Sequence, residues 1–105
     1  MNEQCVQEIS FSLVATAGQA RSLAFEALKA AKIGDFARAD ELMEQSEAAS
    51  LEAHHVQTSL LSDEASGEHV PVDILLVHAQ DHLMTSMLAQ ELIREIICLR
   101  KDQAK

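Results

Sequence analysis

The sequence is poor in aromatic residues and in the residues that interrupt regular structure. It has no tryptophan or tyrosine, and only three phenylalanines, three glycines and one proline among 105 residues. A sheet of many short strands needs more turn-forming residues, because glycine and proline supply most tight turns. The core must therefore be built from alanine, leucine, isoleucine, valine and methionine, most of which favour helices. We expect an all-α protein.

Positive charge is also scarce, with 8 lysines and arginines against 17 aspartates and glutamates and a net charge of -9. Because phosphate backbones repel an acidic surface, we expect no nucleic-acid partner. Cys5 and Cys98 form no CxxC motif and no disulfide framework, which fits a reducing compartment. The first residues, Met-Asn-Glu-Gln, are acidic where a signal peptide is basic, and no apolar run reaches the roughly 18 residues of a membrane span. A soluble cytoplasmic protein is expected.

The length predicts one domain, residues 1–105, made of helices that the turn-forming residues separate. Gly34 is expected to end the first helix with a positive φ, and Asp35 to cap the second. Pro71 suits the first turn of the third helix, and Gly18 inside the first indicates a close backbone approach. Since the first connection is short, the fold is predicted as an antiparallel, up-down-up three-helix bundle. The expected helices are about 3–32, 36–61 and 72–101.

The third predicted helix is apolar around more of its circumference than one three-helix core can bury. Two other helices can cover only one side of it, and a short chain gains stability by oligomerisation. We therefore expect a closed cyclic assembly through this helix. Its apolar residues fall on several stripes: Leu88, Leu92, Ile96 and Leu99 on one, and Leu76, Leu83, Met87, Ile93 and Ile97 on others.

Polar residues interrupt this apolar helix on one face, at spacings i, i+3, i+4 and i+7: His78, Asp81, His82 and Thr85. The apolar flanks predict that the face is buried, and buried ionisable groups are costly unless they are paired or used. The cluster is therefore a candidate functional site. The other three histidines do not belong to such a cluster on an apolar face, and no role is assigned to them: His54, His55 and His69.

Three interpretations of the cluster remain open. A metal site would use His78, Asp81 and His82, but Ala79 stands where a zinc-protease motif has glutamate, and no further ligand is evident. A non-catalytic scaffold would use the polar face only to fix the register of an oligomer.

In the third interpretation, one imidazole is a nucleophile that carries a phosphoryl group, because a neutral ring attacks phosphorus readily near pH 7. Gln80, His82 and Thr85 could donate hydrogen bonds to the phosphoryl oxygens. The Asp81 carboxylate would repel phosphate, so we expect it on a symmetry axis, with a hard ion such as Mg²⁺ between the copies. The spacing does not choose between His78 and His82.

Residues Val77–Met87 resemble the active-site signature of the lactose/cellobiose-type enzyme IIA of the bacterial phosphoenolpyruvate-dependent sugar phosphotransferase system. The resemblance covers roughly residues 6–103. Ala79 and Thr85-Ser86 are more similar to the N,N'-diacetylchitobiose and cellobiose branch than to the lactose branch. Other stretches that resemble the family are Gly18–Ser22, Gly34–Phe36, Glu52–His54 and Val56–Thr58.

This resemblance implies a homotrimer, a nine-helix bundle, that works as a phosphotransferase component in sugar uptake. It implies that His78 takes a phosphoryl group from HPr and passes it to a cysteine of enzyme IIB, during import of a sugar of the diacetylchitobiose, cellobiose or lactose type. Three copies of Asp81 would share a metal ion on the trimer axis. Gln80 and His82 would line the site at the subunit boundary.

Overall fold

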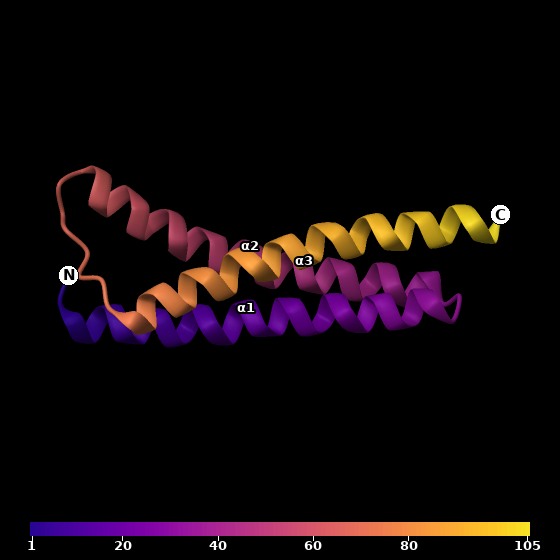
Figure 1. Ribbon diagram of the computed structural model, residues 1–105, viewed down its shortest axis with the longest axis horizontal. Helices are drawn as coiled ribbons and strands as arrows, with labels where there is room; N and C mark the ends of the chain where they lie inside the picture. The colour runs from indigo at the N-terminus through magenta and orange to yellow at the C-terminus, as the bar shows by residue number, and fades with distance from the viewer.

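The computed structural model describes all 105 residues and consists of three long helices without strands. They are α1 (Glu3–Lys32), α2 (Phe36–Ala65) and α3 (Ile74–Ala104). The molecule is a rod of 53 × 21 × 18 Å in which the three helices alternate in direction (Figure 1). The prediction of an all-α, up-down-up bundle is confirmed for the single chain.

Each helix begins at a side chain that accepts a hydrogen bond from the first turn. Asn2 caps α1 by accepting from the Cys5 amide at 2.8 Å, and Asp35 caps α2 as predicted. Gly34 has a φ of 83° and follows Ile33, the C-cap residue of α1. The predicted positive φ at Gly34 is therefore confirmed, one residue beyond the cap itself.

Helix α1 has the predicted bounds, whereas the end of α2 and both ends of α3 differ from the prediction. Helix α2 continues to Ala65 instead of about 61, because nothing in the polar sequence after Leu61 stops a helix. Helix α3 begins at Ile74 and ends at Ala104, instead of running from about 72 to 101. Its N-cap is Asp73, whose carboxylate accepts from the Leu76 amide at 2.8 Å, so Pro71 precedes the helix rather than lying in its first turn.

Helix α1 is the central support, and both other helices pack along it through small residues. Five of its alanines are almost fully buried and allow close helix packing: Ala17, Ala20, Ala24, Ala27 and Ala31. The buried face of α2 includes polar residues at places where a more apolar neighbour was available. Ser50 and Gln57 are buried, whereas the more apolar Ala49 and Val56 are half-buried.

A polar contact joins the three helices between the two apolar clusters of the core. Ser46 of α2 donates to the Ala20 carbonyl of α1 at 2.6 Å. Gln90 of α3 donates its amide to the Ser46 hydroxyl at 2.8 Å. All three residues are at least nine-tenths buried, so these bonds satisfy groups that water does not reach.

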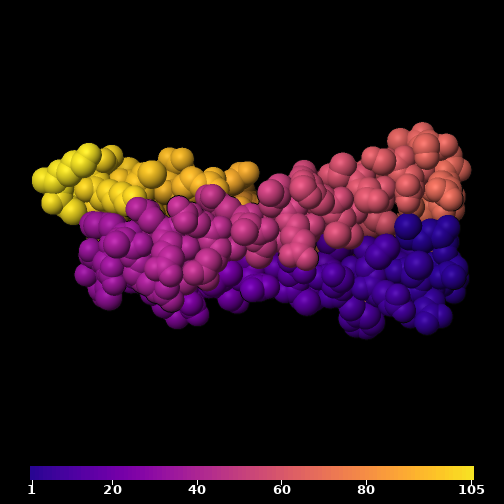
Figure 2. Space-filling view, turned by 180° about the vertical axis from the view of Figure 1, so that it is seen from behind, coloured from indigo at the N-terminus to yellow at the C-terminus, as the bar shows by residue number.

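Helices α2 and α3 diverge toward the end of the rod where the N-terminus lies (Figure 1). Viewed from behind, α2 crosses the visible face, and the yellow C-terminal end of α3 extends beyond it (Figure 2). Val70, in the connection between the two helices, packs in the same apolar cluster as Val6 of α1. The divergence leaves an apolar groove of about 340 Å³ near the start of α3, with Gln80 and Val77 on its wall.

An apolar stripe remains exposed along α3, as the surplus of apolar residues predicted. Its members keep between 41% and 88% of their surface, so the chain itself does not cover them. The stripe consists of Ile74, Val77, Met84, Leu88, Leu92, Ile96 and Leu99.

Candidate functional site

The two imidazoles of the predicted site stack on one another. His78 and His82 lie one turn apart on α3, with ring centroids 6.0 Å apart and planes inclined by 13°. The ring of His78 is exposed and that of His82 is half-buried. This leaves His78 as the imidazole that a second protein can reach.

The predicted burial of this face is wrong for the single chain. Asp81 and Thr85 are exposed like His78, because their face of α3 points away from α1 and α2. They lie along the exposed stripe instead of in the core. Covering these residues would therefore require a second molecule.

Helix α1 supports the more buried ring. A Cβ placed on Gly18 would lie 3.5 Å from Nε2 of His82. The expected close approach at Gly18 is therefore made by an imidazole and not by a helix backbone. Since His82 stacks on His78, the α1 surface helps to set the position of both rings.

Thr85 does not offer its hydroxyl proton to the site. The hydroxyl donates to the Asp81 carbonyl at 2.9 Å, with a second contact of 3.3 Å to the His82 carbonyl. Such bonds to the preceding helical turn are common for threonine. The donor role that the spacing suggested for Thr85 is not formed in this arrangement.

Asp81 lies within the exposed stripe and makes no ion pair. No three histidine, cysteine, aspartate or glutamate side chains converge anywhere in the chain. The metal site proposed from His78, Asp81 and His82 is therefore not built within one chain. A metal held by Asp81 would need carboxylates from other copies.

Gln80 lies on the flank of α3 opposite to His78, where a side chain of α2 bonds to it. Gln57 donates its amide nitrogen to Oε1 of Gln80 at 2.6 Å, and the same nitrogen lies 3.5 Å from Sδ of Met84. Only 8% of Gln57 is exposed. Gln57 belongs to the stretch Val56–Thr58, which resembles the family, but no role was assigned to it from the sequence. Its polar side chain at the core spacing between Ala53 and Leu60 was the available signal.

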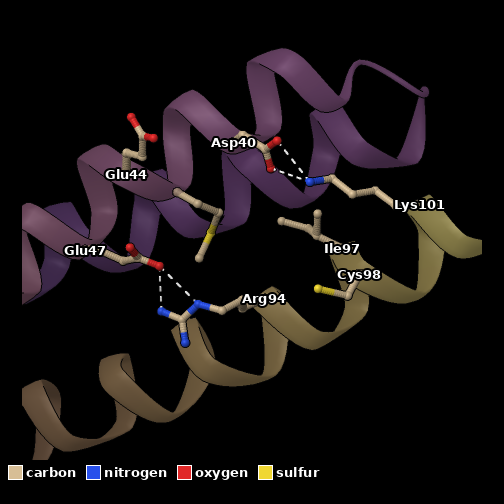
Figure 3. A pocket seen from close by; sticks show the side chains of 8 residues that line it. Asp40, Glu44, Glu47, Arg94, Ile97, Cys98 and Lys101 are labelled. Atoms are coloured by element: carbon tan, nitrogen blue, oxygen red, sulfur yellow. Dashed lines mark hydrogen bonds and ion pairs between the residues drawn. The ribbon is translucent and has the colours of Figure 1, made fainter.

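A second groove lies between α2 and α3 near the C-terminus, away from the imidazoles (Figure 3). Two ion pairs cross it, Arg94 with Glu47 at 2.6 Å and Lys101 with Asp40 at 2.7 Å. All four side chains are at least a third exposed, where ion pairs contribute little to stability. The ion pairs link α2 to α3 across the groove without adding much stability, and they place no catalytic group there.

Comparison with known families and proteins gives one consistent result. The family described as PTS system, Lactose/Cellobiose specific IIA subunit matches residues 8–101. The N,N'-diacetylchitobiose-specific EIIA component of Escherichia coli strain K12 is 54% identical over 91% of this chain and 83% of the relative. The lactose-specific EIIA component of Lactococcus lactis is 47% identical over the full length of both chains. The predicted resemblance to the family is thus confirmed, and the higher identity favours the diacetylchitobiose branch.

Solved structures agree with the sequence relatives. The cellobiose-specific enzyme IIA of Bacillus anthracis superposes with a TM-score of 0.91 at 45% identity, covering 99% of this chain and 94% of the other. The IIA(Chitobiose) protein of the Escherichia coli phosphotransferase system, solved in complex with HPr, gives a TM-score of 0.83 at 50% identity over both full chains.

Proposed function

The chain belongs to the lactose/cellobiose-specific IIA family of the phosphotransferase system, and from that premise we propose that it carries phosphoryl groups on His78. The donor is phosphorylated HPr, and the acceptor is a cysteine of the cognate enzyme IIB. The transfers serve uptake of a sugar of the diacetylchitobiose, cellobiose or lactose type. The observation that carries the proposal is the exposed His78 ring, held on a long helix by its stack on His82.

The proposed chemistry is an in-line transfer. A lone pair of the neutral His78 ring forms a bond to phosphorus while the bond between phosphorus and the donor breaks. The phosphoryl group has a loose, metaphosphate-like character in flight, so positioning and hydrogen-bond donors supply most of the catalysis. The ring of His82 stacks beside that of His78, and we propose its N–H group as one such donor.

Gln80 is a second donor, and its place on α3 implies that it acts on another copy. Successive residues of a helix are about 100° apart, so Gln80 points roughly opposite to His78 around the helix. The exposed stripe, with Asp81 within it, separates the two. In a cyclic assembly packed on this stripe, one flank of each protomer meets the opposite flank of its neighbour. Gln80 of one protomer would then lie beside His78 of the next.

A homotrimer of nine helices is the assembly that we propose for this stripe. Three copies of Asp81 would approach one another at its axis, where like charges repel unless a cation lies between them. Oxygen ligands suit a hard ion such as Mg²⁺, which would offset most of the charge of the three carboxylates there. Asp81 alone contributes to that ion, and the phosphoryl transfer does not pass through it.

The proposed partners are the two proteins that exchange the phosphoryl group. The complex of a 50% identical IIA protein with HPr supports HPr as the donor. No nucleic acid is expected at a surface with a net charge of -9. None of the three helices is long and apolar enough to cross a membrane. Because Cys5 and Cys98 are both free and exposed, the reducing cytoplasm is the compartment that we propose.

The test is reconstitution with phosphoenolpyruvate, enzyme I and HPr, followed by intact-protein mass spectrometry. We expect the wild type to gain one phosphoryl group that acid removes, and His78→Gln to gain none. His54→Gln is the matched control, because His54 is also exposed but lies on α2. Normal labelling of His78→Gln would overturn the assignment. A wild type without acid-labile phosphate would favour the non-catalytic scaffold.

A further inference from the structure

Gln57 is a buried polar residue whose side-chain partners, Gln80 and Met84, both lie on α3 beside the predicted site. It reaches from α2 to α3, where its amide nitrogen donates to Oε1 of Gln80 at 2.6 Å. An apolar side chain would fill the same core position without the cost of burying an amide. The hydrogen bond to Gln80 offsets that cost, so the burial of Gln57 depends on the acceptor that Gln80 supplies.

The contact with Met84 shows which end of the Gln57 amide faces α3. A thioether sulfur accepts hydrogen bonds and donates none, so the end of Gln57 that lies 3.5 Å from Sδ of Met84 is the NH₂ end. That NH₂ group therefore also faces Gln80 and requires an acceptor there. The Gln80 amide satisfies the requirement with its oxygen, which directs its own NH₂ group away from α2.

We propose that Gln57 is a positioning residue that keeps Gln80 presenting a hydrogen-bond donor to the phosphoryl group. The inference rests on the proposed function, in which that group is carried on His78 of the neighbouring protomer. Phosphoryl oxygens are acceptors only, so an inverted Gln80 amide would offer them a repulsive carbonyl. Gln57 prevents the inversion, because turning Gln80 around would oppose two NH₂ groups.

A purely mechanical role for Gln57 makes a different prediction. Helices α2 and α3 diverge in this region, and the hydrogen bond could simply hold them together (Figure 1). In that case any substitution that keeps the helices tied would preserve the transfer rate. The orientation role instead requires that the direction of the hydrogen bond be kept.

Gln57→Glu separates the two roles, because glutamate has the same shape but only accepts hydrogen bonds when ionised. The ionised carboxylate can bond to Gln80 only if Gln80 turns its NH₂ group inward. Because burial raises the pKa of a carboxyl group, the rate is measured at alkaline pH, where this group is ionised. The rate of phosphorylation by phospho-HPr is measured by rapid quench over a range of donor concentrations. We expect the limiting rate to fall about tenfold or more, as when one preorganised donor is lost, while the half-saturating concentration of HPr stays the same.

Gln90→Glu is the matched control, since Gln90 is an equally buried amide that links α3 to α2 through Ser46. It also places a carboxylate in the core, but far from Gln80 along α3. We expect its transfer rate to match the wild type, with circular dichroism confirming that both variants are folded. Equal slowing of the two variants, or a normal rate in Gln57→Glu, would overturn the positioning role.

A double-mutant cycle with Gln57→Leu keeps the inference testable if Gln57→Glu folds poorly, because leucine is an apolar side chain of similar volume. If Gln57 acts through Gln80, adding Gln57→Leu to Gln80→Ala causes no further slowing. Additive slowing would show that Gln57 acts by another route and would overturn the inference. A wild type that phospho-HPr does not label would overturn the proposed function as well, so the two failures are distinguishable.

Discussion

His82 rests against Gly18, with Nε2 lying 3.5 Å from the point where a Cβ would stand on that glycine. Glycine in a helix interior costs about 1 kcal/mol relative to alanine. A methyl group at Gly18 would make ordinary van der Waals contact with the ring, whereas any longer side chain would occupy the space that the ring needs. The position thus limits side-chain size while leaving alanine acceptable.

Gly18→Ala and Gly18→Leu should therefore separate helix stability from site geometry. We expect Gly18→Ala to raise the free energy of unfolding by about 0.5–1 kcal/mol, without changing the rate of phosphorylation. Gly18→Leu should displace His82, disturb its stack on His78 and slow phosphorylation several-fold. Urea denaturation and rapid-quench labelling by phospho-HPr measure the two effects. A normal rate in Gly18→Leu would show that His82 need not rest on α1.

Two buried serines offer a matched comparison, because changing each to alanine should affect the free energy of unfolding differently. Ser46 bonds to Ala20 and Gln90, whereas the buried hydroxyl of Ser86 has no partner. We expect Ser46→Ala to lower the free energy of unfolding by about 1–3 kcal/mol, since it leaves the buried Gln90 amide without its hydrogen-bond acceptor. Ser86→Ala should be neutral or stabilising.

Urea denaturation of both serine variants measures this difference directly. Both residues lie inside long helices, so the gain in helix propensity on changing serine to alanine is common to both. Phosphorylation should be unaffected in Ser46→Ala, because its contacts lie outside the imidazole site. If Ser86→Ala lost as much stability as Ser46→Ala, the stabilising role of the hydrogen bonds from Ser46 to Ala20 and Gln90 would be contradicted.

Local chemistry made much of the fold predictable. Gly34 and Asp35 carry their own turn and cap preferences, so the first connection could be located from neighbouring residues alone. The end of α2 has a similar local signal, because Gly67, with a φ of 95°, follows the C-cap residue Ser66. The prediction ended this helix at about 61 because the residues after Leu61 are polar, and polar residues suit an exposed helix as well as a loop.

The site was harder to predict because its residues come from two helices, with Gln57 on α2 and the others on two flanks of α3. Spacing placed His78 and His82 on one face, and the structure stacks their rings. Gln57 lies in a stretch that resembles the family, but its role stayed open because only the fold brings it to Gln80. The face was expected to be buried because apolar flanks do not reveal whether the same chain or another copy covers them.

Asp81 gives a prediction about assembly. Replacing it with leucine should preserve or strengthen the proposed trimer, because it removes three like charges from an apolar interface. Leu88→Asp, one heptad further along the same stripe, should disrupt the trimer by adding such charges. Sedimentation velocity with and without a chelator measures both effects. Monomeric Asp81→Leu would contradict the proposed place of this residue at the axis.

Mixed assemblies test whether each site is shared between two protomers. His78→Gln lacks the acceptor but retains Gln80, whereas Gln80→Glu retains His78 and presents a carboxylate in place of the amide. Each should be labelled slowly or not at all when alone, since every site then lacks one group. After unfolding and refolding together, some sites should combine His78 from one protomer with Gln80 from its neighbour.

We expect the mixture to label faster than the sum of its separate components, with the phosphoryl group found only on the Gln80→Glu chains. The two chains differ in mass, so mass spectrometry identifies which one is labelled. If His78 and Gln80 instead acted within one chain, every site would remain defective and mixing would give no gain. The helical positions of the two residues favour the gain, because the exposed stripe of α3 separates them within a chain, and the proposed trimer would bring them together only between chains.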